Sequence, residues 1–157
     1  LGGCVQNAEE GKIMAQDALE NGAAWEKFKQ LIEVQGGDIS YLEHPDRLPA
    51  APLVENLTSP RSGYLSGVDA RIVGETSVDL GAGRAKKTDS IDHAVGIEVL
   101  LNVGDYVEKG QPVYIVHANN QELLAAASER LLTALAWSDS PVEPLPLFYE
   151  VIGEKSR

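Results

Sequence analysis

The sequence is short of cysteine: Cys4 is the only one among 157 residues, so a disulfide within the chain is excluded. So little cysteine is typical of a reducing compartment, and we expect a cytoplasmic location. Long apolar runs are also lacking. No stretch approaches the roughly 20 apolar residues that a membrane-spanning helix needs, which predicts a soluble protein with no membrane partner. The chain begins at Leu1 rather than methionine and shows no signal peptide, and we expect it to be a segment of a longer protein.

Positive charge is scarce as well. The chain has 13 lysines and arginines against 24 aspartates and glutamates, which gives a formal net charge of −11 at pH 7. A nucleic-acid surface needs clustered cations to neutralise phosphates, and the one dense basic run is Arg84-Ala-Lys-Lys. We therefore expect no nucleic-acid partner.

The three histidines of the chain are His44, His93 and His117. No two of them stand at the short spacing typical of metal ligands, and Cys4 is distant in sequence from all three. The sequence therefore predicts no metal site, and local structural or surface roles are expected for the histidines.

The N-terminal part has a helical pattern. Asn7 and Glu10 have the form of a capping box, in which the Asn side chain accepts from an early amide and the Glu reaches back to the cap amide. Asn21-Gly22 suits the end of this first helix, and a second helix is predicted from about Ala23 to the glycine pair Gly36-Gly37. We expect two short helices packed as an antiparallel pair.

Each of these helices carries one apolar stripe. Trp25, Phe28 and Leu31 follow helical spacing in the second helix, and Trp25 is expected in the core of the pair. Two helices of this size cannot cover both stripes by themselves, which predicts a further packing partner. Prolines then recur within residues 45–58, at positions 45, 49 and 52, so this segment is expected to be a linker or a wrapping strand.

After Ser59 the pattern changes to short strand-forming runs punctuated by glycine. Strands are expected at residues 63–65, 71–73, 95–101, 112–117 and 147–152. The stretch 69–83 is ambiguous, and a helix is favoured where Val78-Asp-Leu precedes the glycines. A helix is predicted from Asn120 with an apolar face that extends to Leu135, and Trp137, late in this helical region, is expected to cover the edge of the β-domain.

Residues 104–113, Gly-Asp-Tyr-Val-Glu-Lys-Gly-Gln-Pro-Val, place tight turns before and after a short strand. The same form recurs in barrel-sandwich hybrid domains. The fold class we predict is α+β: a helical hairpin over residues 1–44, a proline-rich linker over 45–58, and a barrel-sandwich-hybrid-like β-rich domain with a packed helix over 59–157.

Several blocks, in order and spacing, resemble the C-terminal domain of pyrimidine-nucleoside and thymidine phosphorylases of bacteria. They lie at residues 59–64, 80–92, 94–97, 103–112 and 115–119. Upstream, residues 23–28, 35–38 and 45–49 resemble the end of the large α/β domain of the same family. The resemblance therefore covers nearly the whole chain and implies that the helical hairpin belongs to that large domain.

The resemblance implies an enzyme that uses inorganic phosphate to split a pyrimidine nucleoside into free base and pentose-1-phosphate. In this family the phosphate loop, the residues that contact the base and the ligands of the monovalent cation seen in some members lie earlier in the chain. No match to them occurs here. We therefore assign no catalytic, cofactor-binding or metal-binding residue to this segment, and expect it to be inactive alone. Its expected partner is the N-terminal catalytic region of the same enzyme, and the parent is expected to be a homodimer.

The loop that follows Leu80 is the candidate functional element. Its two glycines and three cations could suggest a phosphate loop, but the Walker pattern and its strand-to-helix context are absent. We instead predict an interdomain docking loop. The residues assigned to it are Arg84, Lys86, Lys87, Asp89 and Asp92.

Two other functions stay open from the residues alone. A biotinyl or lipoyl carrier would present a modified lysine at a hairpin tip, and Lys86-Lys87 is the one lysine pair, but the Met-Lys-Met or Asp-Lys-Ala context is absent. A non-catalytic interaction module is the other alternative.

Overall fold

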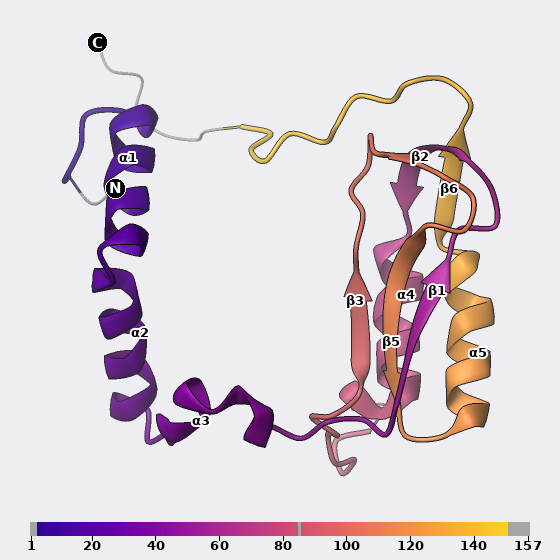
Figure 1. Cartoon of the computed structure of the whole chain (residues 1–157), viewed down its shortest axis with the longest axis horizontal. Helices are drawn as coiled ribbons and strands as arrows, with labels where there is room; N and C mark the ends of the chain where they lie inside the picture. The colour runs from indigo at the N-terminus through magenta and orange to yellow at the C-terminus, as the bar shows by residue number, and fades with distance from the viewer. Residues whose placement is uncertain (1–2, 85, 151–157) are drawn as a thin grey trace. The chain divides into compact units, whose positions relative to one another are not determined.

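The fold was analysed in a computed structural model, which describes residues 3–84 and 86–150 (Figure 1). The chain divides into two compact units, one up to Leu48 and one from Pro49 onwards. Helices and two small antiparallel sheets are both present, which confirms the α+β class. Within the described ranges, no helix is long and apolar enough to cross a bilayer.

The first unit begins with helix α1, Ala8–Glu20. The Oδ1 atom of its N-cap, Asn7, accepts a hydrogen bond from the Glu10 amide at 2.9 Å, as the capping box predicts. The reciprocal bond differs from the expected one, because Glu10 Oε2 accepts from the Gln6 amide, at 2.9 Å, instead of the cap amide. The start of the helix is therefore fixed by local side chains.

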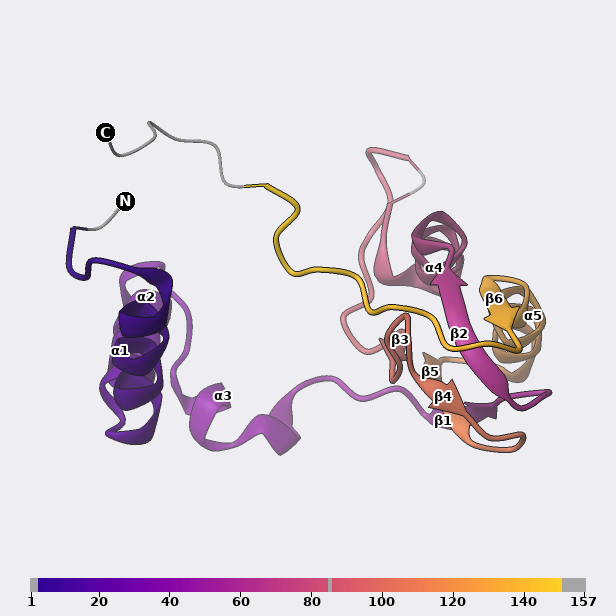
Figure 2. The same ribbon diagram turned by 90° about the horizontal axis from the view of Figure 1, so that it is seen from above.

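Helix α2, Ala23–Val34, follows after Asn21 and the left-handed Gly22 (φ 82°). The structure does not confirm antiparallel packing of the pair. In Figure 1 α2 continues where α1 ends, and the two overlap in the view of Figure 2, so they run end to end. Neither helix has a buried residue. The prediction of Trp25 as a core residue is wrong, since it is 47% exposed. The short helices α3, Ser40–Glu43, and η1, Pro45–Arg47, complete the unit.

The second unit contains a sheet in the order β1-β5-β3. Its strands are β1, Leu53–Thr58, β5, Pro112–Ala118, and β3, Gly96–Val99, all antiparallel to their neighbours. The segment 45–58 was expected to be a linker or a wrapping strand. Strand β1 lies in the second half of this segment, so that half is a strand. The β-rich unit therefore includes residues before position 59.

The second sheet has the order β4-β2-β6, with β2, Gly63–Val68, between β4, Tyr106–Val107, and β6, Leu135–Ser138. Leu135 pairs with Val68 in this sheet. The prediction that Leu135 continues the last helix is wrong, because the helix has already ended and the chain pairs with β2. Trp137 likewise lies in β6, not in a helix, and packs against the core of the unit.

Residues 71–73, predicted as a strand, lie in helix α4, Ala70–Ser77. The carboxylate of Asp69 caps this helix by accepting from the amides of Arg71 and Ile72 at 2.9 and 3.2 Å, and such a cap favours helix over strand. A π-helical turn, η2, Val78–Ala82, continues α4. The helix favoured at the end of 69–83 is thus confirmed.

Helix α5, Gln121–Leu132, begins at the predicted cap, where Asn120 Oδ1 accepts from the Leu123 amide at 2.9 Å. Its buried residues, Leu124, Ala127 and Leu131, belong to the core of the unit. The core joins these residues to β1, β4, β5 and η2. Its buried members include Leu57, Leu80, Val107, Val113, Tyr114, Val116, Leu124, Ala127 and Leu131.

The chain leaves β6 as an extended segment. A strand was predicted at 147–152, but residues 147–150 form none. Val151 and Ile152 lie outside the described residues. Prolines at 141, 144 and 146 interrupt the preceding stretch, and this segment finds no strand to pair with in the part of the unit that the structure describes.

Candidate functional site

The predicted docking loop connects η2 to β3 and extends beyond α4, away from the sheets (Figure 2). Gly81 adopts φ 110°, a conformation that favours glycine, and turns the chain out of the helix. The loop returns to the same point, because the Asp92 amide donates to the Gly81 carbonyl at 3.0 Å. Its two ends are therefore held together by the backbone.

The two acids of the predicted docking set form hydrogen bonds that shape the loop and attach it to the unit. The Oδ2 atom of Asp89 accepts from the Lys86 amide at 2.8 Å, and the Asp89 amide donates to the Lys86 carbonyl at 3.0 Å. Asp92 Oδ1 accepts from the Ala94 amide at 2.9 Å, and its Oδ2 accepts from Asn119 Nδ2 at 2.6 Å. These two hydrogen bonds, first the one from Ala94, hold the pKa of Asp92 below its usual value.

The three cations of the set are arranged differently. Arg84, Lys86 and Lys87 are exposed, and their side chains form no ion pair with any residue in the described ranges. The structure thus separates the set into two carboxylates that shape the loop and three cations that face solvent. This arrangement suits contact with an acidic surface, because the loop does not have to reorganise to present its charges.

The position of the loop follows from its bond to Asn119. This residue comes directly after β5, whose last residue, Ala118, pairs with Leu53 at the start of β1. The loop and the entry of the chain into the unit therefore flank the same end of the sheet. A contact made by the loop would form at the end of the unit where the preceding residues 49–52 arrive.

The geometry of the loop does not favour the phosphate-loop alternative. A Walker loop runs from a strand into the N-terminus of a helix, whereas this loop runs from a helical turn into β3. The Lys86 amide, one of the donors that could face an anion, is already bonded to Asp89. The carrier alternative also lacks its hairpin, since Lys86 and Lys87 are not at a turn between two paired strands.

The three histidines belong to different segments of the structure. His117 Nε2 lies 2.8 Å from Glu98 Oε1 across β5 and β3. His93 is exposed in the loop and His44 follows α3. Over residues 3–84 and 86–150, no three side chains of His, Cys, Asp or Glu form a group that could hold a metal ion.

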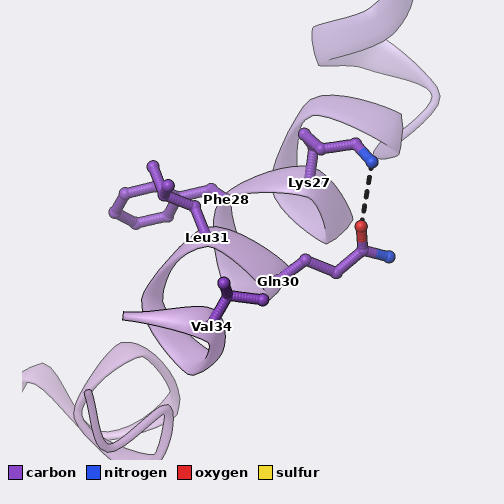
Figure 3. Close-up of a pocket in the computed structure, with 5 residues that line it drawn as sticks. All are labelled: Lys27, Phe28, Gln30, Leu31 and Val34. Carbon is purple, nitrogen blue, oxygen red and sulfur yellow. Dashed lines mark hydrogen bonds between the residues drawn. The ribbon is translucent and has the colours of Figure 1, made fainter. Parts of the chain in front are cut away.

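The first unit presents an apolar surface that sequence reasoning placed in a helix-pair core. Phe28, Leu31 and Val34 are 42%, 50% and 86% exposed on α2. With Lys27 and Gln30, which are joined by a 2.9 Å hydrogen bond, they line a shallow groove of about 390 Å³ (Figure 3). Within the described residues of the first unit, nothing buries these apolar side chains, and the further packing partner stays a prediction.

These features define a class of protein: a small β-rich domain with its own core and a basic loop, held in shape by its carboxylates, at one end. Residues 64–138, from β2 to the end of β6, match the family model described as the pyrimidine nucleoside phosphorylase C-terminal domain. A pyrimidine-nucleoside phosphorylase of Staphylococcus aureus (strain bovine RF122 / ET3-1) is 36% identical to the chain over 150 residues, and the protein of strain USA300 shows the same identity over the same length. The match covers 96% of this chain and 34% of each relative, so the chain spans about a third of their length.

The chain is therefore similar to the C-terminal portion of the pyrimidine-nucleoside phosphorylase family. The match to the relatives is longer than the family model, because it also takes in the helical unit that precedes β1. The family model includes the resembling blocks 80–92 and 103–112, and the match to the relatives also includes residues 59–64.

Proposed function

We propose that this chain serves as the C-terminal part of an enzyme that converts a pyrimidine nucleoside and inorganic phosphate into free base and pentose-1-phosphate. The observation that carries the proposal is the 36% identity to proteins named pyrimidine-nucleoside phosphorylases over 96% of the chain. The role of this part is structural: it docks against the catalytic region and takes no part in bond cleavage.

The chemistry of phosphorolysis supports this division. The reaction needs a cradle of amides and cations for phosphate and donors for the charge that develops on the base. In the family, the elements that the resemblance implies for these tasks precede the part matched here. The co-substrate phosphate, and the monovalent cation of some members, would accordingly be bound by the N-terminal catalytic region, and this chain supplies no residue to the set.

The docking role falls to Arg84, Lys86 and Lys87. Their exposure, and a loop already shaped by Asp89 and Asp92, support contact with carboxylates of the large domain. Surface ion pairs contribute on the order of 0.2–1 kcal/mol each, so three of them steady a domain contact without making it permanent. Such a contact would affect turnover by fixing how the domains close.

The finer architecture belongs to the same proposal. Two three-stranded antiparallel sheets around one core, with the turn at Gly104, are consistent with a barrel-sandwich-hybrid-like domain. Helices α1 and α2 would form the end of the large α/β domain, which would cover their exposed apolar faces. The parent would be a cytoplasmic homodimer that acts in nucleoside salvage.

The test compares two proteins: this chain, and the longer protein encoded by the complete reading frame. Each is incubated with uridine or thymidine and phosphate, and release of the free base is followed by absorbance. The proposal expects turnover by the longer protein and none by the 157 residues. Turnover by the chain alone would show that catalytic residues lie within it.

The carrier alternative is tested by intact mass. After coexpression with biotin- and lipoyl-attaching enzymes, the chain should keep its unmodified mass. A stoichiometric adduct on Lys86 or Lys87 would replace the docking role by a carrier role.

A further inference from the structure

The last described segment, Leu145–Tyr149, exposes large apolar side chains. Leu145 is 61% exposed, and Leu147, Phe148 and Tyr149, three residues in succession, are 94%, 81% and 80% exposed. A contiguous group of large apolar side chains this exposed is typical of an interaction site. These residues have no role in the core of the β-rich unit.

The backbone of this segment is also unpaired. Within the described residues, no hydrogen bond involves the amides or carbonyls of residues 141–150. Prolines at 141, 144 and 146 favour an extended chain, and Leu147, Phe148 and Tyr149 are followed by further strand-forming residues in the sequence. An extended segment with open amides and carbonyls is the form in which a peptide adds to a sheet edge.

The base of the segment is anchored, which limits where it can reach. Asp139 pairs with Arg61 directly after β6. Further on, the chain crosses Gly104, which has φ 101°. The carbonyl oxygen of Val142 and the nitrogen of Pro144 lie 3.1 Å from the position that a β-carbon would take there. The exposed residues therefore begin at a fixed point on the β-rich unit.

Two observations select the partner. An alignment of 150 residues within a chain of 157 necessarily includes positions 145–149, although the family model ends at Ser138. The segment is therefore part of what this chain shares with longer proteins. A second copy of the chain is disfavoured, because each carries a net charge of −11 and the segment itself is flanked by Glu143 and Glu150.

We propose that Leu145–Tyr149 is a docking strand that adds to an open sheet edge of the large domain of the same protein. This inference rests on the proposed function, since that function supplies the large domain. The strand would bring this segment of the chain to the catalytic region, while the basic loop makes its contact at the other end of the β-rich unit.

Hydrogen exchange measured by mass spectrometry tests the docking strand. The amides of residues 147–150 should exchange at least tenfold more slowly in the longer protein than in the 157-residue chain. Equal, fast exchange in both proteins would overturn the proposal. Protection in the isolated chain that increases with its concentration would also overturn it, because a second copy would then be the partner.

Variants in the longer protein sharpen this test. The double change Leu147→Ser with Phe148→Ser should remove the protection of residues 147–150, whereas Val99→Ser, at a 46% exposed position in β3, should leave it unchanged. Base release is measured on the same samples. Turnover without protection refutes the docking strand alone, and protection without turnover refutes the proposed function alone.

Discussion

Asp92 and Asn119 join the candidate docking loop to the end of β5 through a hydrogen bond of 2.6 Å from Asn119 Nδ2 to Asp92 Oδ2. The two residues are 27 positions apart in the sequence, and the bond holds the loop at the end of the sheet where the chain enters the unit. Asp92 also accepts from the Ala94 amide, so one carboxylate fixes both the local turn and its position on the sheet.

Asp92→Asn should loosen the loop, because an amide oxygen accepts these bonds more weakly than a carboxylate. We expect faster hydrogen exchange at the Ala94 amide and an unchanged fold elsewhere. Glu129→Gln, at an exposed position of α5, is the matched control and should leave that amide unaffected. Unchanged exchange in Asp92→Asn would mean that the carboxylate does not hold the loop.

The same carboxylate predicts an acid-sensitive loop. The pKa of Asp92 is lowered in the folded chain, so its contribution to stability is present above the unfolded pKa of about 3.9 and is lost as the pH falls through the folded value. Exchange at Ala94, corrected for its intrinsic pH dependence, should therefore accelerate below about pH 4 in the wild type and show no such step in Asp92→Asn.

Replacing Arg84, Lys86 and Lys87 together by glutamine should weaken domain docking in the longer protein. Three exposed ion pairs of roughly 0.5 kcal/mol each correspond to about a tenfold loss of kcat/KM. The melting temperature of the isolated chain should not change, since these side chains make no ion pair with the described residues.

The control for this triple variant is Lys109→Gln, which lies in the exposed turn between β4 and β5. Its kcat/KM should equal that of the wild type. The difference between triple variant and wild type should also shrink as salt is added, because exposed ion pairs are screened. A difference that is independent of salt would contradict an electrostatic contact.

Tyr114 has a fully buried ring, and its hydroxyl lacks a hydrogen-bond partner among the described residues. Tyr114→Phe removes the unsatisfied group and should raise the free energy of unfolding by about 1 kcal/mol, measured by urea denaturation. Tyr106→Phe, at a 56% exposed position, should change it by less than about 0.5 kcal/mol. A clear loss of stability in Tyr114→Phe would reveal a bond that the hydroxyl makes in solution.

Alkaline pH gives a second measurement on Tyr114. Burial raises its pKa to about 12, so the folded chain retains this proton where the unfolded chain, with a pKa of about 10, loses it. The contribution is fully present below pH 10 and is lost as the pH rises towards about 12. The wild type should lose stability over this interval by more than Tyr114→Phe does.

Helix caps could be predicted from the sequence because they depend on residues that are close in sequence. Asn7 and Asn120 cap α1 and α5 as predicted, each through a 2.9 Å bond to an amide three residues ahead. Asp69 carries the same signal for α4, and recognising it would have corrected the strand predicted at 71–73. The five residues assigned to the docking loop were chosen from composition and position, and their docking role stays a prediction.

Pairing between distant strands could not be read in this way. Leu135 fits the apolar period of α5, but β6 forms because Val68, 67 positions earlier, offers a partner edge. The separate roles of the loop residues were also hidden, since the bond of Asp92 to Asn119 depends on where β5 ends. The exposed stripe on α2 belongs to the same class, because the first unit alone does not bury it.

We propose that this chain is a docking portion of a pyrimidine-nucleoside phosphorylase and carries none of its catalytic residues. The most direct measurement is phosphate-dependent release of uracil or thymine by the isolated chain and by the longer protein at equal molar concentration. We expect release by the longer protein and none above background by the 157 residues. Phosphate-dependent turnover by the isolated chain would contradict it.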